Sequence, residues 1–197
     1  MAMDMEACFA LLAKRRRDEI VITSAGNSSE LWWETTRDRN NTFYLEASMS
    51  LSTMFTAGIA LGYPGARFWA FMGDGAFVMN TGVLFVERWL ALPNMVSVIM
   101  ANRCYGSTSA AALPDGQQID FAAVAKAAGI ANVFHFSDLA TLDKGFDTAF
   151  QSVGSTTIVL ELAAPTRHFE SPPIDGPEMK YLFGRALEER FGQKVLP

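Results

Sequence analysis

The sequence predicts an α/β fold, a doubly wound and mostly parallel sheet of about six strands with helices on both faces. Three observations lead to this prediction. Short apolar runs rich in β-branched and aromatic residues alternate along the chain with segments of helical period. Several runs, such as residues 96–100, are almost continuously apolar, as parallel strands buried on both faces are. No internal repeat or low-complexity linker interrupts this alternation, so we expect one layered domain.

The expected elements follow one another from residue 4 to residue 191. The apolar, β-rich runs predict strands at residues 20–23, 42–45, 67–72, 95–101, 132–135 and 156–162. The helical period predicts helices at residues 4–14, 28–34, 51–61, 77–91, 121–128, 139–153 and 177–191. In such a fold ligands bind beyond the carboxyl ends of the strands, so functional motifs are expected where a strand ends.

The bulk composition narrows the class of protein. With 197 residues, 50% of them hydrophobic and 19% charged, the chain suits one substantial core and is too short for two ordinary domains. The net charge of −5 indicates no basic surface for nucleic acid, and the basic run at residues 14–17 is followed at once by Asp18 and Glu19. Cys8 and Cys104 are too widely spaced to form a zinc ribbon or to hold an iron–sulfur cluster alone.

The sequence predicts neither a membrane protein nor an exported one. No uncharged segment reaches the roughly 18 residues needed to cross a bilayer. The apolar stretch at residues 8–13 precedes the basic run, which is the reverse of the order in a signal peptide. A reducing cytoplasm is therefore the expected compartment.

A candidate phosphate and metal motif follows the third expected strand. Gly73, Asp74, Gly75 and Ala76 lie where that strand ends and a helix begins. The glycines permit a tight turn in which main-chain N–H groups approach an anion, and the helix N-terminus adds the positive end of its dipole. Because the aspartate would repel a bare phosphate, the motif predicts a divalent cation, Mg²⁺ by preference, between carboxylate and phosphate.

A second source of oxygen ligands follows the next expected strand, residues 95–101. Neighbouring parallel strands would bring Asp74 and Asn102 to the same edge of the sheet. The side-chain oxygen of Asn102 and the main-chain carbonyl of Cys104 would then add to the Mg²⁺ shell begun by Asp74. Taken singly, a Gly-Asp-Gly turn and an asparagine at a strand end are also common features of ordinary loops.

Together these motifs resemble the signature of thiamine-diphosphate enzymes, in which GDG is followed, after an amphipathic helix, by an asparagine pair. The stretches GDGAFVMNTG (73–82) and ANRCYGSTS (101–109) are similar to those of the small β subunit of sulfopyruvate decarboxylase and of phosphonopyruvate decarboxylase. The stretch DFAAVAKAAG (120–129) resembles the helix that follows the metal loop across the family. Order and spacing agree over residues 19 to 165.

The resemblance implies a diphosphate-binding (PP) domain over residues 1–175, followed by a C-terminal helix, 176–197, that packs on this domain or on a partner subunit. It implies Asp74, Asn102 and Cys104 as Mg²⁺ ligands, with Ala101 standing where the family has its first asparagine. It also implies contacts to thiamine diphosphate from several strand ends. These contacts are Gly26, Asn27, Ser28, Ala47, Ser48, Met49, Gly73, Asp74, Gly75, Ala76, Asn102, Cys104, Tyr105 and Gly106.

Two places depart from the family pattern. Where the family usually has GSMG or GTMG, this chain has Ala47, Ser48, Met49 and Ser50. By position the Ala47 carbonyl would accept a hydrogen bond from the cofactor's amino group, and Met49 would wedge beneath the cofactor unless it is a core residue. Ser50 in place of glycine is expected to narrow the pocket. Ser29 stands about where phosphonopyruvate decarboxylases carry a basic residue, which argues against a doubly anionic substrate.

The resemblance also implies a partner, because thiamine catalysis needs a glutamate beside the aminopyrimidine ring. In this family the glutamate lies on a separate pyrimidine-binding domain, and Glu46 is the one local rival, so no catalytic residue is assigned here. The expected protein is the β subunit of a heteromeric (α₂β₂ or larger) 2-oxoacid decarboxylase, a lyase acting on a small 2-oxoacid. His135 and His168 are expected to be structural or exposed, with His168, beside Arg167, the better candidate for substrate contact.

Other classes of function remain open at this point. The chain resembles, less closely, a subunit of a thiamine-diphosphate carboligase or of the E1 component of a 2-oxoacid dehydrogenase. The non-enzymatic alternative is a domain that binds a nucleotide or serves as a scaffold. Trp32 and Trp33 are expected to pack a helix onto the sheet instead of forming a substrate wall.

Overall fold

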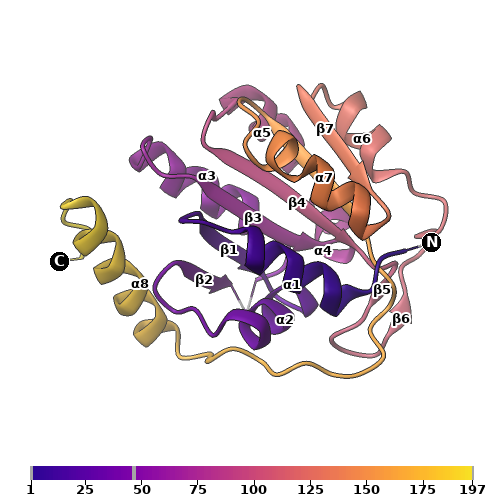
Figure 1. Ribbon diagram of the computed structural model, residues 1–197, viewed down its shortest axis with the longest axis horizontal. Coiled ribbons are helices and arrows are strands. Elements are labelled where there is room, and N and C mark those ends of the chain that lie inside the picture. The colour runs from indigo at the N-terminus through magenta and orange to yellow at the C-terminus, as the bar shows by residue number, and fades with distance from the viewer. Residues whose placement is uncertain (1, 46–47, 197) are drawn as a thin grey trace.

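A computed structural model describes residues 2–45 and 48–196, and these form three layers, with a twisted sheet between two sets of helices (Figure 1). The main sheet has six strands in the order β2-β1-β3-β4-β8-β7, and every neighbouring pair is parallel. Its strands are β1 (Ile20–Ser24), β2 (Thr42–Leu45), β3 (Phe68–Gly73), β4 (Met95–Ala101), β7 (Asn132–Phe136) and β8 (Thr156–Glu161). The predicted fold class and all six predicted strands are confirmed, with ends shifted by one residue at most.

Helices connect the strands and cover both faces of the sheet. They are α1 (Met5–Arg15), α2 (Asn27–Thr36), α3 (Ser52–Gly62), α4 (Asp74–Met79), α5 (Val83–Leu90), α6 (Phe121–Ala127), α7 (Leu139–Phe150) and α8 (Gly176–Phe191). Asp120 and Asp138 cap α6 and α7 by accepting hydrogen bonds from Ala123 and Thr141. None of the described helices is long and apolar enough to span a membrane.

One predicted helix, residues 77–91, is wrong in outline. The structure has two shorter helices, α4 and α5, separated by a turn in which Asn80 ends α4 and Gly82 precedes α5. Asparagine and glycine are turn-forming residues, and the apolar run on either side concealed the break. A second feature escaped prediction, a small antiparallel hairpin of β5 (Cys104–Tyr105) and β6 (Ala111–Ala112) that follows β4.

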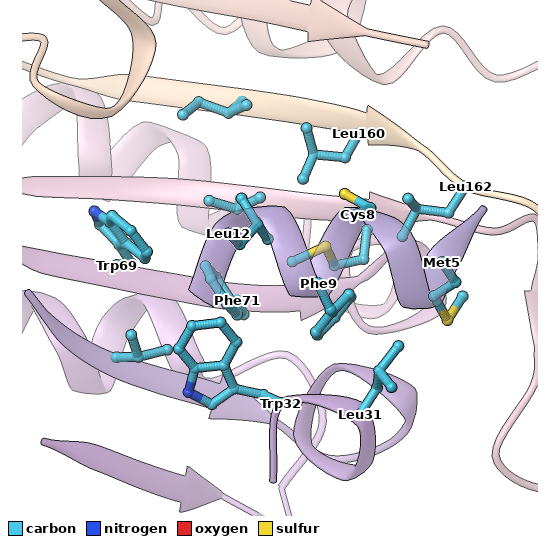
Figure 2. Close-up of a cluster of buried hydrophobic side chains, with 14 of the residues drawn as sticks. Met5, Cys8, Phe9, Leu12, Leu31, Trp32, Trp69, Phe71, Leu160 and Leu162 are labelled. Carbon is cyan, nitrogen blue, oxygen red and sulfur yellow. The ribbon is translucent and has the colours of Figure 1, made fainter. Parts of the chain in front are cut away.

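The face of the sheet under α1, α2 and α7 holds an aromatic core (Figure 2). Trp32 of α2, Phe71 of β3 and Phe9 of α1 are almost fully buried, and the Trp32 and Phe71 rings lie 5.2 Å apart, edge to face. Burial of each such side chain stabilises the fold by roughly 1.5–3 kcal/mol. Trp32 also donates a hydrogen bond to Thr42, and Trp33 donates one to Glu170. Both tryptophans therefore pack the helix onto the sheet, as predicted.

The opposite face is covered by α3, α4, α5 and α6, and by α8 at the β2 edge. Ile20, Ile22 and Phe68 alternate with the side chains that point into the aromatic core, as expected for strands buried on both faces. The C-terminal helix α8 contacts β2, and the Phe183 ring lies 5.2 Å from the Phe43 ring. The division into a domain of 1–175 and a C-terminal segment of 176–197 remains a prediction.

Candidate active site

A pocket of about 50 Å³ lies at the carboxyl ends of β1, β3 and β4. Residues from three separate strand ends line it, as expected for a ligand site in a sheet of this kind. The predicted site residues in this lining are Gly26, Asn27, Ser28, Met49, Gly73, Asp74, Gly75, Ala76, Asn102, Cys104, Tyr105 and Gly106. Ala47, together with Glu46, lies outside the described residues. The fold thus brings together segments that are about 75 positions apart in the chain, such as Asn27 and Asn102.

Asp74 is the buried acidic group of the pocket, with 1% of its surface exposed. Its Oδ1 accepts a hydrogen bond of 2.9 Å from the Gly75 N–H, and its Oδ2 accepts one of 2.7 Å from the Arg103 N–H. Burial raises the pKa of Asp74 to about 6, and the two N–H donors oppose that rise. The carboxylate is therefore only partly compensated by the protein, which favours a bound cation beside it.

Asn102 and Cys104 follow β4, the parallel neighbour of β3. The Asn102 Nδ2 donates to Asn27 Oδ1 at 3.4 Å, and the Cys104 N–H donates to Asn102 Oδ1 at 3.2 Å. A carboxamide oxygen has two lone pairs, so the Asn102 oxygen keeps one for a further partner. Burial and the charge of Asp74 raise the pKa of the Cys104 thiol, which disfavours the thiolate form that binds metals. The group that Cys104 can offer to Mg²⁺ is therefore its main-chain carbonyl oxygen.

Two glycines permit close contacts that line the pocket. A Cβ atom at Gly75 would lie 2.6 Å from the Tyr105 ring, and one at Gly106 would lie 2.3 Å from Asn27 Oδ1. Gly26, which precedes α2, has a φ of +104°, a conformation that favours glycine. The first main-chain N–H groups of α2, at Asn27 and Ser28, have no acceptor inside the helix and are available to an anion.

The loop before α3 differs from the expectation at two positions. Ser48 is absent from the described lining, and its carbonyl instead accepts hydrogen bonds from the Ala25 N–H and the Ser24 hydroxyl, both at 3.3 Å. Ser50 has a φ of +68°, so a serine holds a left-handed conformation that residues other than glycine seldom adopt. It does not line the pocket, so the expected narrowing is not seen. Met49 lines the pocket and also packs against the core around Met72.

The inference drawn from Ser29 is not supported by its position. Ser29 is fully buried, and its hydroxyl shares a 2.5 Å hydrogen bond with Thr23 of β1. Because this side chain packs against the sheet and lies outside the described pocket lining, it carries no information on the charge of the substrate.

The histidines and Arg167 are not among the residues that line the pocket or the depression beside it. His135 is on β7, at the edge of the sheet, with its Nε2 3.2 Å from Glu161. His168 is exposed. The Arg167 guanidinium forms ion pairs with Glu6 and Glu34, at 2.9 Å and 2.7 Å, so it joins the segment between β8 and α8 to α1 and α2.

Several pocket residues were not predicted from the sequence. They are Met5, Phe9, Ala25, Met100, Ser107 and Leu162. Ala25 and Ser107 stand next to predicted residues, so a wider window around each motif would have included them. The α1 residues reach the pocket because Met3 pairs with Leu162 in an isolated β-bridge beyond β8, a contact without a local sequence signal. They supply an apolar wall behind the polar groups.

The pocket widens toward the surface into a depression of about 400 Å³. Gly26, Met49 and Tyr105 are among the residues that line both the pocket and the depression. Glu30 and Thr108 line the depression alone. A small pocket that combines polar groups with an apolar wall, next to a wider depression, suits a ligand that is held at one end and covered at the other.

The fold and these strand-end residues define a cofactor-binding domain, and comparison with known proteins identifies its family. The model of the thiamine pyrophosphate enzyme family, C-terminal TPP binding domain, matches residues 24–160. The chain therefore belongs to this family and is a thiamine-diphosphate-binding domain.

Relatives of known name share much of the chain. The chain is 28% identical to the β subunit of sulfopyruvate decarboxylase from Methanocaldococcus jannaschii, over 86% of this chain and 89% of that subunit. It is 33% identical to the corresponding subunit from Methanothermobacter thermautotrophicus, over 70% of each chain. It is 31% identical to phosphonopyruvate decarboxylase from Streptomyces viridochromogenes, over 77% of this chain and 38% of that protein.

Solved structures share the fold. Benzoylformate decarboxylase from Polynucleobacter necessarius has a TM-score of 0.70 at 19% identity, over 84% of this chain and 34% of that one. The thiamine diphosphate-dependent 4-hydroxybenzoylformate decarboxylase of Rhodococcus jostii has a TM-score of 0.66 at 19% identity, over 83% and 33%. This chain thus spans about a third of those two proteins.

Proposed function

We propose that this chain is the β subunit of a two-subunit 2-oxoacid decarboxylase that depends on thiamine diphosphate and Mg²⁺. In this proposal it supplies the diphosphate and metal half of an active site that a separate pyrimidine-domain subunit completes. The observation that carries the proposal is the buried Asp74 carboxylate, brought to one pocket with Asn102 and Cys104 by the parallel pairing of β3 and β4.

The donors at this pocket fit Mg²⁺. They are a carboxylate, a carboxamide oxygen and a main-chain carbonyl, which are the hard oxygen ligands that Mg²⁺ prefers. Among the described residues, no group of three or more His, Cys, Asp or Glu side chains is placed to hold a metal ion, as a zinc site would require. A single protein carboxylate leaves coordination positions for phosphate oxygens and water.

The N-terminus of α2 and the loop after β4 fit a diphosphate. Asn27 and Gly106 meet across the pocket so closely that a Cβ atom on Gly106 would collide with Asn27. This contact brings the first turn of α2 next to the cation ligands, so an anion bridging the metal and the helix N-terminus is stabilised from both sides.

Bound thiamine diphosphate supplies the nucleophilic carbon and the electron sink for decarboxylation. The residues of this chain bind and orient it. Asp74, Asn102 and Cys104 hold the cation, Asn27 and Ser28 receive the diphosphate, and the apolar residues Met5 and Phe9 exclude water from the rear of the pocket. Met49, which lines both the pocket and its mouth, is placed to support the part of the cofactor nearer the surface.

A partner subunit is part of the proposal. The relatives matched over most of their length are named as β subunits, which implies a second kind of subunit in those enzymes. Helix α4 begins at Asp74 in the site. The end of α4 and the helix that follows it, α5, expose several large apolar side chains. These are Val78, Met79, Phe85, Val86 and Trp89. Apolar surface of this kind marks an interaction site.

Calorimetry of the chain purified with the product of the neighbouring gene tests the proposal. The pair is expected to bind thiamine diphosphate in the presence of Mg²⁺ and to release CO₂ from one or more of a panel of 2-oxoacids. Asp74→Ala is expected to abolish metal-dependent binding, while Asp138→Ala, which removes only a helix cap, leaves it intact. Absence of Mg²⁺-dependent binding by the wild-type pair would refute the proposed function.

A further inference from the structure

The Arg103 side chain belongs to the loop that carries Asn102 and Cys104, but it is not among the residues that line the pocket. Its Nη1 donates to the carbonyls of Gly116 and Ile119 at 2.6 Å and 2.8 Å, and its Nη2 donates to Glu161 at 2.5 Å. It also lies over the Phe121 ring, 4.7 Å from the centroid. The side chain is mostly buried, as is that of Glu161.

The main chain of Arg103 takes part in the site itself. Its N–H donates to Asp74, and its carbonyl accepts a 2.9 Å hydrogen bond from the Leu113 N–H. Its φ is +63°, in the left-handed region that residues other than glycine seldom adopt. Such a conformation costs about 1–3 kcal/mol and persists where surrounding contacts determine it. The contacts of the guanidinium are those that fix this residue.

We infer that Arg103 is the positioning residue of the loop 102–106. Its side chain joins three separate parts of the chain, namely the end of β8 at Glu161, the loop before α6 at Gly116 and Ile119, and α6 itself. Because the same residue holds Asp74 through its N–H, this clamp sets the spacing between Asp74 and its neighbours Asn102 and Cys104.

The chemistry of the clamp requires arginine. The planar guanidinium presents donors in several fixed directions at once, and here they meet a carboxylate and two carbonyls. A lysine in its place has one compact ammonium group and cannot match this geometry. The role is one of positioning, since the guanidinium itself makes no contact that would place it on a ligand in the pocket.

A matched control exists at the other end of the sheet. Arg67, just before β3, donates to the carbonyls of Pro93, Phe150 and Ser152 at 2.6–3.1 Å and is also partly buried. Arg67→Met therefore removes a comparable set of hydrogen bonds without touching the loop 102–106.

Amide hydrogen exchange of the full chain without ligand tests the clamp directly. In Arg103→Met, exchange of the Arg103 and Leu113 amides is expected to accelerate about tenfold or more relative to wild type, whereas Arg67→Met leaves these amides unchanged. Glu161→Gln provides a milder variant if Arg103→Met does not fold, and the same amides are expected to accelerate. Unchanged exchange at these amides in the folded variant would overturn the inference.

The second measurement rests on the proposed function. In the assembled pair, the affinity for Mg²⁺ at saturating thiamine diphosphate is expected to fall about 10- to 100-fold in Arg103→Met, with partial recovery at most in Arg103→Lys and no change in Arg67→Met. Equal losses in the Arg103 and Arg67 variants would mean general destabilisation and would overturn the inference. If the wild-type pair binds no Mg²⁺, the proposed function is wrong, and the exchange experiment still decides the role of Arg103.

Discussion

Gly106 and Asn27 approach each other so closely that a Cβ atom on the glycine would lie 2.3 Å from the asparagine Oδ1. The same Cβ would lie 2.7 Å from Cγ of Pro165, which belongs to the segment after β8. The loop after β4 thus lies tightly between α2 and the segment that follows β8. Any side chain at position 106 has to separate the two walls of the pocket.

Gly106→Ala is therefore expected to weaken Mg²⁺-dependent binding of thiamine diphosphate by about tenfold or more, because the shift separates Asn27 from the cation ligands. Calorimetry of the assembled pair measures this. Gly65→Ala is the control, since a Cβ atom there would meet nothing within 4 Å. Unaltered affinity in Gly106→Ala would show that the contact has no part in binding.

Glu87 predicts a pH dependence of stability. Burial raises its pKa to about 7, against about 4.3 in an unfolded chain, while a hydrogen bond of 2.8 Å from Ser97 opposes the rise. The folded protein holds this proton more tightly than the unfolded chain does. The resulting stabilisation is full below about pH 4.3 and is lost as the pH rises through 7, with an upper limit of roughly 4 kcal/mol.

Denaturant unfolding at several pH values between 5 and 8.5 measures this dependence. Glu87→Gln removes the titration and can retain the hydrogen bond to Ser97, so its free energy of unfolding is expected to change less over this range than that of the wild type. Parallel pH profiles of the two proteins would contradict the prediction. The other carboxyl groups are common to both proteins, so they cancel in the comparison.

Ser50 predicts a backbone effect. Replacing Ser50 by glycine relieves the strain of the left-handed conformation. Glycine also gives the unfolded chain more conformational freedom, which lowers stability and offsets this gain. Ser50→Gly is therefore expected to change the free energy of unfolding by less than about 1 kcal/mol, whereas β-branched valine lowers it by more than that. Urea unfolding measures the free energy of unfolding of each variant. Ser137→Val is the control, because Ser137 is exposed and is not among the residues with a positive φ. A neutral Ser50→Val would contradict the argument.

Trp89 predicts an effect on assembly. It is 80% exposed on α5, next to other exposed apolar residues, and large aromatic side chains contribute strongly to protein interfaces. Trp89→Ser is expected to weaken association with the partner subunit by about tenfold or more in sedimentation velocity experiments. Val153→Ser, which changes a side chain that is 70% exposed elsewhere, serves as the control. Wild-type association of Trp89→Ser would exclude this face from the interface.

The sheet and the strand-end motifs were predictable because their signals are local. Residues 95–101 are apolar except for Ser97, since β4 is buried on both faces, and Asp74 and Asn102 follow directly where their strands stop. Parallel pairing of neighbouring strands then places those two residues at one edge without further information. This is why most of the predicted pocket residues are found together.

The remaining features depend on contacts between distant parts of the chain. The left-handed conformation of Arg103 is fixed by Gly116, Ile119 and Glu161, and no pattern around residue 103 indicates it. Ser29 shows the converse error. Its alignment with a basic residue of phosphonopyruvate decarboxylases suggested a bearing on the substrate, but the first turn of α2 directs its side chain toward Thr23 in the core.

The turn at residues 80–82 divides the segment predicted as one helix into two helices with different roles. Helix α4 holds Asp74 and packs Ala76 and Phe77 into the core, so changes in its buried first turn alter the chemistry or the fold. Helix α5 begins after the turn and exposes Trp89. A change in the partner contacts of its outer surface therefore need not disturb the reaction centre.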